Sequence, residues 1–203
     1  MHPWSIPRTS SEAYRREKPE FTWTANYPGV FMYHCATPSV LVHMANGMIG
    51  MVVVEPADGY PTTVAQEYGI VQNEFYAKQQ GGIYVLDTAK AKSRQPTHVT
   101  FNGKSGQYVV RPLKAKTGER VRMYVLNVGP NLFSNFHVIG TILDKVWLDG
   151  NPKNELNGMQ SVTLGPGSGA IVEFVLPEKG SYHFVDHSFA NAEMGAMGTI
   201  KAE

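Results

Sequence analysis

The chain has 203 residues, of which 42% are hydrophobic and 17% charged, and its formal net charge at pH 7 is +1. This composition is typical of a globular protein and excludes intrinsic disorder. The Lys and Arg residues are scattered, which argues against nucleic acid as a partner, and no apolar run is long enough to span a membrane.

The N-terminal residues 1–19 are polar and contain three prolines and a charged cluster. We expect them to form an arm that precedes the folded part, and we expect His2 to be solvated. The first residues lack the apolar core of a signal peptide. Polar and apolar residues alternate over residues 21–25, which predicts a strand there.

The only cysteine of the chain lies in the next stretch. Cys35 ends a predicted strand at residues 30–35, a turn is expected at residues 36–41, and His43 and Met48 follow. Thiolate, imidazole and thioether in this order suit a mononuclear blue copper site, where one Cys and two His bind in a plane with a long axial Met. A lone Cys is otherwise most often a small buried hydrophobe. The spacing favours the copper site.

The residue before this cysteine is also a candidate metal ligand. Side chains alternate between the two faces of a strand, so His34 and Cys35 are expected to point in opposite directions. A backbone link between two such ligands would give an electron a short path. This arrangement suggests two metal centres, one that receives electrons and one that does chemistry.

The rest of the chain reads as many short strands separated by turns. Strands are predicted at residues 49–55 and 66–76, and Asp87 is expected to cap one short helix at residues 87–92. Further strands are expected at residues 98–101, 108–113, 120–127, 136–142, 146–148, 160–164, 170–175, 182–185 and 197–201. This spacing predicts an all-β fold, a β-sandwich.

Four segments carry a resemblance to a known family. They are residues 27–35 (YPGVFMYHC), 43–48 (HMANGM), 129–140 (GPNLFSNFHVIG) and 185–189 (VDHSF). Together they resemble the copper-containing nitrite reductases, in the form with a short loop between the copper Cys and His. The resemblance runs from about residue 21 to residue 203. Single-copper cupredoxins share the first two segments in weaker form and lack the last two.

This resemblance implies a cupredoxin-like Greek-key β-sandwich and two kinds of copper. Cys35, His43 and Met48 match the ligands of the type 1 copper, which receives the electron. His34 and His187 match ligands of the type 2 copper, to which nitrite binds and is reduced to nitric oxide. In the family His187 is donated across the interface of a homotrimer, a small redox protein supplies electrons, and the enzyme is periplasmic.

Two further residues match the substrate pocket of the family. His137 matches the active-site histidine that helps to deliver protons to nitrite, a role that suits a pKa near the working pH. From its apolar context alone, His137 reads equally as a satisfied core histidine. Ile139 matches a residue that crowds the catalytic copper, and Ser161 falls where the family has a hydroxyl near the histidine. His98 and His183 match no family site.

The resemblance also implies a division of the chain. Residues 20–57 match the C-terminal strands and copper loop of a first cupredoxin domain, and residues 58–203 match a complete second one. In the family most of the first sandwich precedes the position of residue 21 and holds one type 1 His, one type 2 His and a catalytic Asp. We therefore expect the chain to be N-terminally incomplete and inactive in isolation.

Three other functions compete with this one. A type 1 copper protein that only transfers electrons would use Cys35, His43 and Met48 alone. An inactive, trimeric cupredoxin-fold fragment would bind no copper. Oxygen reduction at a trinuclear cluster needs a His on both sides of the copper Cys, and here Cys35 is followed by Ala36.

Overall fold

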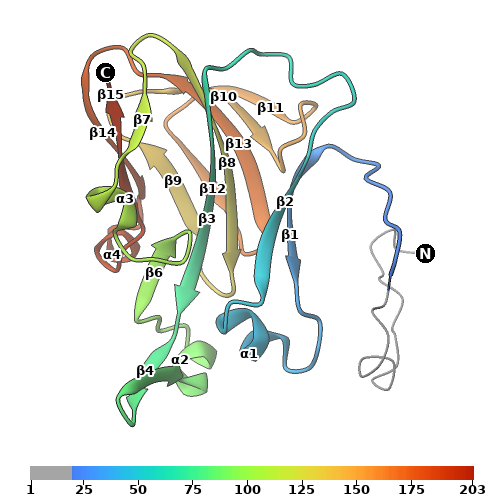
Figure 1. Ribbon diagram of the computed structural model, residues 1–203, viewed down its shortest axis with the longest axis vertical. Coiled ribbons are helices and arrows are strands. Elements are labelled where there is room, and N and C mark those ends of the chain that lie inside the picture. The colour runs from blue at the N-terminus through green and yellow to red at the C-terminus, as the bar shows by residue number, and fades with distance from the viewer. Residues whose placement is uncertain (1–19) are drawn as a thin grey trace.

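The computed structural model describes residues 20–203; the predicted arm at residues 1–19 lies outside them. Its elements follow in chain order (Figure 1). They are β1 (Gly29–His34), α1 (Val40–Ala45), β2 (Ile49–Val54), β3 (Gln66–Phe75), β4 (Ala77–Gln80), β5 (Ile83–Leu86), α2 (Thr88–Lys92), β6 (His98–Phe101), α3 (Gln107–Val110), β7 (Leu113–Ala115), β8 (Arg120–Gly129), β9 (Ser134–Val138), β10 (Leu143–Leu148), β11 (Glu155–Met159), β12 (Ser161–Leu164), β13 (Ser168–Val175), β14 (Gly180–Asp186), α4 (Phe189–Glu193) and β15 (Met197–Ala202). None of the helices in residues 20–203 is long and apolar enough to cross a membrane.

Two mixed sheets form a sandwich. A six-stranded sheet has the order β11-β10-β13-β8-β3-β6, and a five-stranded sheet has the order β12-β9-β14-β15-β7. The β3–β8 and β15–β7 pairs are parallel and the other pairs antiparallel. Because side chains alternate along each strand, every second residue enters the space between the sheets. The prediction of an all-β sandwich is confirmed.

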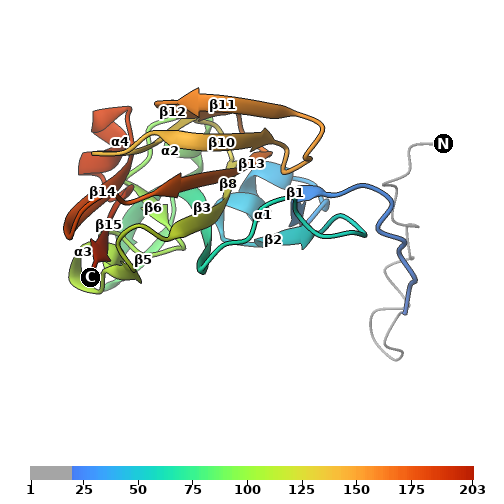
Figure 2. The same cartoon turned by 90° about the horizontal axis from the view of Figure 1, so that it is seen from above.

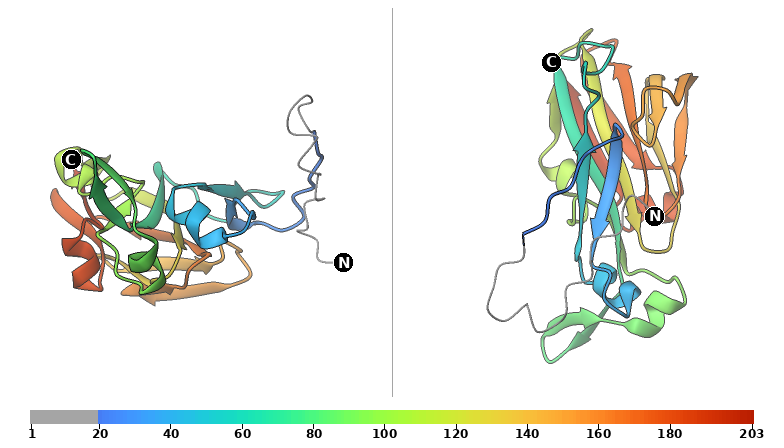
Figure 3. Two further views of the ribbon diagram at one scale, coloured as in Figure 1. Left: turned by 90° about the horizontal axis from the view of Figure 1, so that it is seen from below. Right: turned by 90° about the vertical axis from the view of Figure 1, so that its right-hand side faces the viewer.

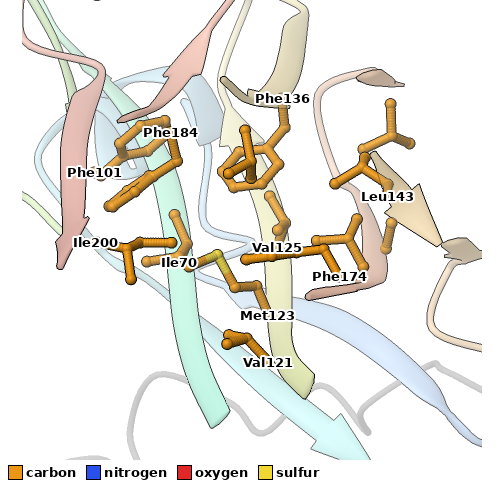
Figure 4. Packing of buried hydrophobic residues seen from close by; sticks show 14 of the residues in the cluster. Ile70, Phe101, Val121, Met123, Val125, Phe136, Leu143, Phe174, Phe184 and Ile200 are labelled. Atoms are coloured by element: carbon orange, nitrogen blue, oxygen red, sulfur yellow. The ribbon is translucent and has the colours of Figure 1, made fainter. Parts of the chain in front are cut away.

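The main core fills this space. Phe101, Phe136 and Phe184 pack against one another with ring centroids 5.4–6.2 Å apart, and all three are buried (Figure 4). Full burial of such a side chain contributes about 1.5–3 kcal/mol. The buried residues of this cluster run from Ile70 to Ala202, so the main core is built entirely by the second part of the chain.

The hairpin of β1 and β2 forms a separate two-stranded ribbon. Its register runs from Gly29 opposite Val54 to His34 opposite Ile49. One face of the ribbon packs on the outer face of the six-stranded sheet (Figure 2). This second cluster contains Val30, Tyr124, Leu126, Val128, Trp147 and Ile171, with Met32, Ile49, Met51 and Val53 at its edge. The six-stranded sheet is therefore covered on both sides.

A third small cluster joins two helices at one end of the molecule. Ala45 of α1 is buried with Tyr76 and Ala91, and Leu41 and Leu86 pack against them. Figure 3 shows α1 beside α2 there. These contacts hold α1, a six-residue helix that is too short to be stable alone.

Four local predictions differ from the structure. The strand expected at residues 136–142 ends as β9 at Val138, where a turn begins. No strand forms at residues 21–25. The turn expected at residues 36–41 gives way to α1 from Val40. At residues 108–113 α3 replaces most of the strand, because Gly106 has φ +60° and the Gln107 side chain donates to the carbonyls of Phe101 and Asn102. The β4–β5 hairpin, β11 and α4 were not predicted.

Candidate metal sites

The first candidate site lies where β1 ends and α1 and β2 begin. The Cys35 amide donates to the carbonyl of Met48 at 3.1 Å, and the Met48 amide donates to the carbonyl of His43 at the same distance. The His43 Nδ1 atom lies 3.4 Å from the Met48 Sδ atom. The hairpin therefore brings the backbone of Cys35 beside Met48 and the imidazole of His43 beside the Met48 thioether, although these residues span fourteen positions of sequence.

The thiol of Cys35 has a lowered pKa. The Thr37 side chain and backbone donate hydrogen bonds that lower the pKa of Cys35 below its ordinary value of 9.0, and burial opposes this only weakly. A lowered pKa favours the thiolate, which is the form that binds metals. Thiolate, thioether and imidazole are ligands that suit copper. The donor set present here therefore fits copper, although no group of three or more His, Cys, Asp or Glu in residues 20–203 could hold a metal ion.

The second candidate site lies on the outer face of the five-stranded sheet. β9 pairs with β14 so that His137 is opposite Val185, and His187 follows the end of β14. The rings of His137 and His187 are 5.2 Å apart. They line a pocket of about 310 Å³ together with Asn135, Gln160 and Ser161.

The ring of His137 is held by a backbone group. Its Nδ1 atom lies 2.5 Å from the Gln160 carbonyl oxygen. Because a carbonyl only accepts, Nδ1 carries the hydrogen, and in the neutral ring Nε2 keeps the lone pair. Ser161 lines the pocket, but the partner of this ring nitrogen is the Gln160 carbonyl. His137 is thus oriented to exchange a proton, or to bind a metal, through Nε2.

The second histidine of the pocket is held through its main chain and its ring. The His187 amide donates to the Asn135 carbonyl at 2.7 Å, and Phe189 packs edge-on against the ring at 4.8 Å. Asn135 and Phe189 were not predicted as site residues. Asn135 is detectable in retrospect, because it lies two residues before His137 and so shares its face of β9.

The remaining predicted residues lie apart from this pair. Ile139 follows β9 and is 42% exposed. His34 ends β1, where its Nδ1 donates to the Cys35 carbonyl at 2.8 Å, so that Nε2 carries the lone pair of the neutral ring. β1 and α4 lie on opposite sides of the six-stranded sheet (Figures 1 and 2). A single chain does not bring His34 and His187 together.

The two other described histidines in the strands of the sandwich serve local contacts. His98 Nδ1 lies 3.3 Å from the Thr97 hydroxyl, and His183 Nδ1 lies 3.1 Å from the Thr199 hydroxyl. Neither residue lines the pocket.

Comparison with known proteins identifies relatives. Two family models, both described as multicopper oxidase, match residues 66–200 and 6–58. The chain is 47% identical over 188 residues to the copper-containing nitrite reductase of Neisseria gonorrhoeae, covering 90% of this chain and 47% of that protein. It is 30% identical over 206 residues to that of Alcaligenes faecalis, covering 91% and 54%. The chain thus spans about half the length of the curated relatives it matches.

Solved structures agree with this result. The copper-containing nitrite reductase from Thermus scotoductus superposes with a TM-score of 0.83 at 36% identity, covering 90% of this chain and 43% of that chain. The copper nitrite reductase from Nitrosomonas europaea gives 0.82 at 37%, covering 90% and 65%. The cupredoxin-like fold is therefore confirmed, and the family implies copper. The chain belongs to the multicopper oxidase family and is a homologue of the copper-containing nitrite reductases.

Proposed function

We propose that this chain takes part in the one-electron reduction of nitrite to nitric oxide and water. The observation that carries the proposal is the pair of His137 and His187, held 5.2 Å apart in an open pocket with Nε2 of His137 as its proton-exchanging atom. The reaction consumes one electron and two protons for each nitrite. It therefore needs an electron route and a proton-transferring group in the same place.

Cys35, His43 and Met48 are the proposed ligands of a type 1 copper, and His34 and His187 are proposed ligands of a type 2 copper. When bound, copper would supply one-electron redox chemistry and a Lewis acid for nitrite. In its protonated form His137 carries a second proton at Nε2 and delivers it to the substrate, while its Nδ1–H stays bound to the Gln160 carbonyl. Ile139, two residues after His137 in the chain, is proposed to limit the space available to the substrate. The His34–Cys35 backbone is the proposed electron path.

The shared copper requires more than one copy of the chain. His34 and His187 lie on opposite sides of the six-stranded sheet, so a site that uses both must combine residues of two protomers. This arrangement supports the homotrimer expected from the resemblance. A small redox protein as electron donor and a periplasmic location belong to the same proposal.

The domain division is also a proposal. The main core begins at Ile70 and ends at Ala202, which supports residues 58–203 as a second cupredoxin domain. Residues 20–57 contain only the ribbon and α1, which supports their assignment to a first domain.

The test is to load the purified chain with Cu(II) and to record visible absorption, and then to measure nitric oxide production from nitrite with an N-terminal segment from a relative added in trans. We expect a thiolate-to-copper band that C35S abolishes and H187Q keeps. Nitric oxide production should be lost in H187Q and reduced about 10²-fold or more in H137Q, as for removal of a general acid. H98Q is the matched control and should change neither signal.

Two outcomes would contradict the proposal. A normal band and electron uptake without nitric oxide, even with an added N-terminal segment from a relative, would favour an electron carrier. A chain that binds no copper in either form would favour an inactive cupredoxin fold.

A further inference from the structure

The segment that contains His187 includes a carboxylate that the proposed reaction does not use. Asp186, the last residue of β14, is 0% exposed. None of the ion pairs formed by residues 20–203 includes it. Burial of a carboxylate without a cation is costly unless N–H groups surround it.

Four N–H donors surround this carboxylate. Oδ1 accepts hydrogen bonds from the amides of Asn135 and Ser188, both at 3.0 Å. Oδ2 accepts from Gln72 Nε2 at 2.9 Å and from Asn191 Nδ2 at 2.8 Å. The carboxylate thus connects four parts of the chain: β9, the residue that follows His187, β3 and α4.

The backbone donors flank the two pocket histidines. Ser188 follows His187 directly, and Asn135 precedes His137 by two residues on the same strand face. The His187 amide donates back to the Asn135 carbonyl, and Asn135 Nδ2 donates to the Ser188 hydroxyl at 3.1 Å. The segments that carry His137 and His187 are therefore hydrogen-bonded to the same carboxylate.

The carboxylate is itself anchored to the opposite sheet. Gln72 belongs to β3 of the six-stranded sheet and is 1% exposed. Its Oε1 accepts a hydrogen bond from the Ser134 hydroxyl at 2.7 Å, while its Nε2 binds Asp186. Side chains held at both ends by buried hydrogen bonds have few alternative positions. The pocket is therefore positioned relative to the core and not only relative to its own sheet.

We propose that Asp186 is a positioning residue that sets the spacing and orientation of His137 and His187 in the pocket. This inference rests on the proposed function for its consequence, because an error of about 1 Å in a catalytic group lowers its efficiency strongly. Asp186 touches neither substrate nor metal. It acts through the backbones of Asn135 and Ser188.

Two substitutions separate position from charge. D186A removes both acceptor oxygens and releases all four donors. D186N keeps Oδ1 for the two backbone amides, and its NH₂ group can face Gln72 and Asn191 after their side-chain amides rotate by half a turn. D186N therefore removes the charge and keeps the framework. D58A, a change at an exposed turn residue, is the matched control.

The measurement is NMR of the metal-free chain, which depends on neither copper nor nitrite. We expect a nuclear Overhauser contact between the His137 and His187 rings in the wild type, D186N and D58A, and its loss in D186A. The Asn135 and Ser188 amides should exchange with solvent about tenfold faster or more in D186A, and at the wild-type rate in D186N. The His98 ring should be unchanged in every variant.

Two results would overturn the inference. One is a folded D186A protein that keeps the ring contact and the slow amide exchange. The other result serves if D186A does not fold. It is a D186N protein that loses the contact between the two rings although the Asn135 and Ser188 amides stay protected. That result would mean that Asp186 acts through its charge and not through its hydrogen bonds. If the chain fails in the nitrite assay while these NMR results hold, the proposed function is wrong and the positioning role stands.

Discussion

The ring of His187 stands edge-on to the ring of His137, with the centroids 5.2 Å apart and 67° between the ring planes. The two residues are separated by fifty positions in the chain and meet because β9 and β14 are paired. The Gln160 carbonyl accepts the hydrogen bond of His137 Nδ1, which leaves Nε2 free to exchange a proton. The orientation of the His137 ring therefore depends on a main-chain group.

A first prediction concerns the neighbouring hydroxyl. S161A should keep His137 in the form with hydrogen on Nδ1, because the Gln160 carbonyl and not the Ser161 hydroxyl is its partner. Any loss of nitrite reduction should stay below about tenfold, or about 1.4 kcal/mol. Nitrogen-15 shifts of the imidazole would report the ring form, with H137Q to assign the signals. A switch of the hydrogen to Nε2 in S161A would contradict this.

A second prediction concerns the thiol. T37V keeps the shape of the side chain and removes the hydroxyl that does most to lower the pKa of Cys35. The pKa should rise toward 9.0, and alkylation of the thiol at neutral pH should slow, because only the thiolate reacts. The pH profile of the iodoacetamide reaction measures this. S39A is the control, and superimposable profiles for T37V and the wild type would refute the assignment.

A third prediction concerns Glu74, a buried acid that is bonded to the loop before β9. Glu74 accepts hydrogen bonds from the amides of Asn131 and Leu132 and from the Tyr76 hydroxyl. Burial raises the pKa of Glu74 above its ordinary value of 4.5, although these hydrogen bonds lower it in part. A raised pKa in the folded state means that stability is present below 4.5 and is lost as pH rises through the folded pKa.

E74Q cannot lose a proton, so its free energy of unfolding relative to the wild type should increase as the pH is raised from about 4.5 to about 8. Urea unfolding across this range is the measurement. E178Q, at an exposed position, should track the wild type. If the difference between E74Q and the wild type were the same at every pH, the raised pKa would be disproved.

A fourth prediction concerns the main core. Phe184 is 0% exposed and packs against Phe101, Phe136 and Tyr108. F184A should lower the free energy of unfolding by about 3–5 kcal/mol, because it removes apolar contacts and leaves a cavity. V110A, at a residue that is 81% exposed, should change it by less than about 0.5 kcal/mol. Equal denaturant midpoints for the two variants would place Phe184 outside the core.

The sequence predicted elements well where the signal is local. The strand at residues 98–101 has the bounds of β6, and the Asp87 side chain caps α2 through the amides of Ala89 and Lys90, as expected. The strand expected at residues 21–25 does not form, because alternation over five residues does not decide whether a segment joins a sheet. At residues 108–113 a glycine with positive φ redirected the chain into α3.

The same distinction holds for the candidate sites. Cys35, His43 and Met48 lie in one hairpin, so their spacing alone predicted one site, and the structure shows the contact between the His43 and Met48 side chains. The meeting of His137 and His187 depends on a long-range strand pair, and only the resemblance pointed to it. The role of the Gln160 carbonyl could not be predicted from the sequence, because every residue has a carbonyl and the fold sets the direction in which it points.

The ribbon of β1 and β2 has a genetic consequence. Residues 121–129 of β8 are buried without a break, since one set of side chains faces the main core and the other faces the ribbon. A saturation library of this strand would show no alternation between tolerant and intolerant codons. In β12, by contrast, Thr163 is exposed between two buried neighbours and contributes only a hydroxyl bond to Asn135, so its codon should accept more substitutions than theirs. Tolerance to substitution that alternates from one residue to the next would thus identify the strands with one face exposed to solvent.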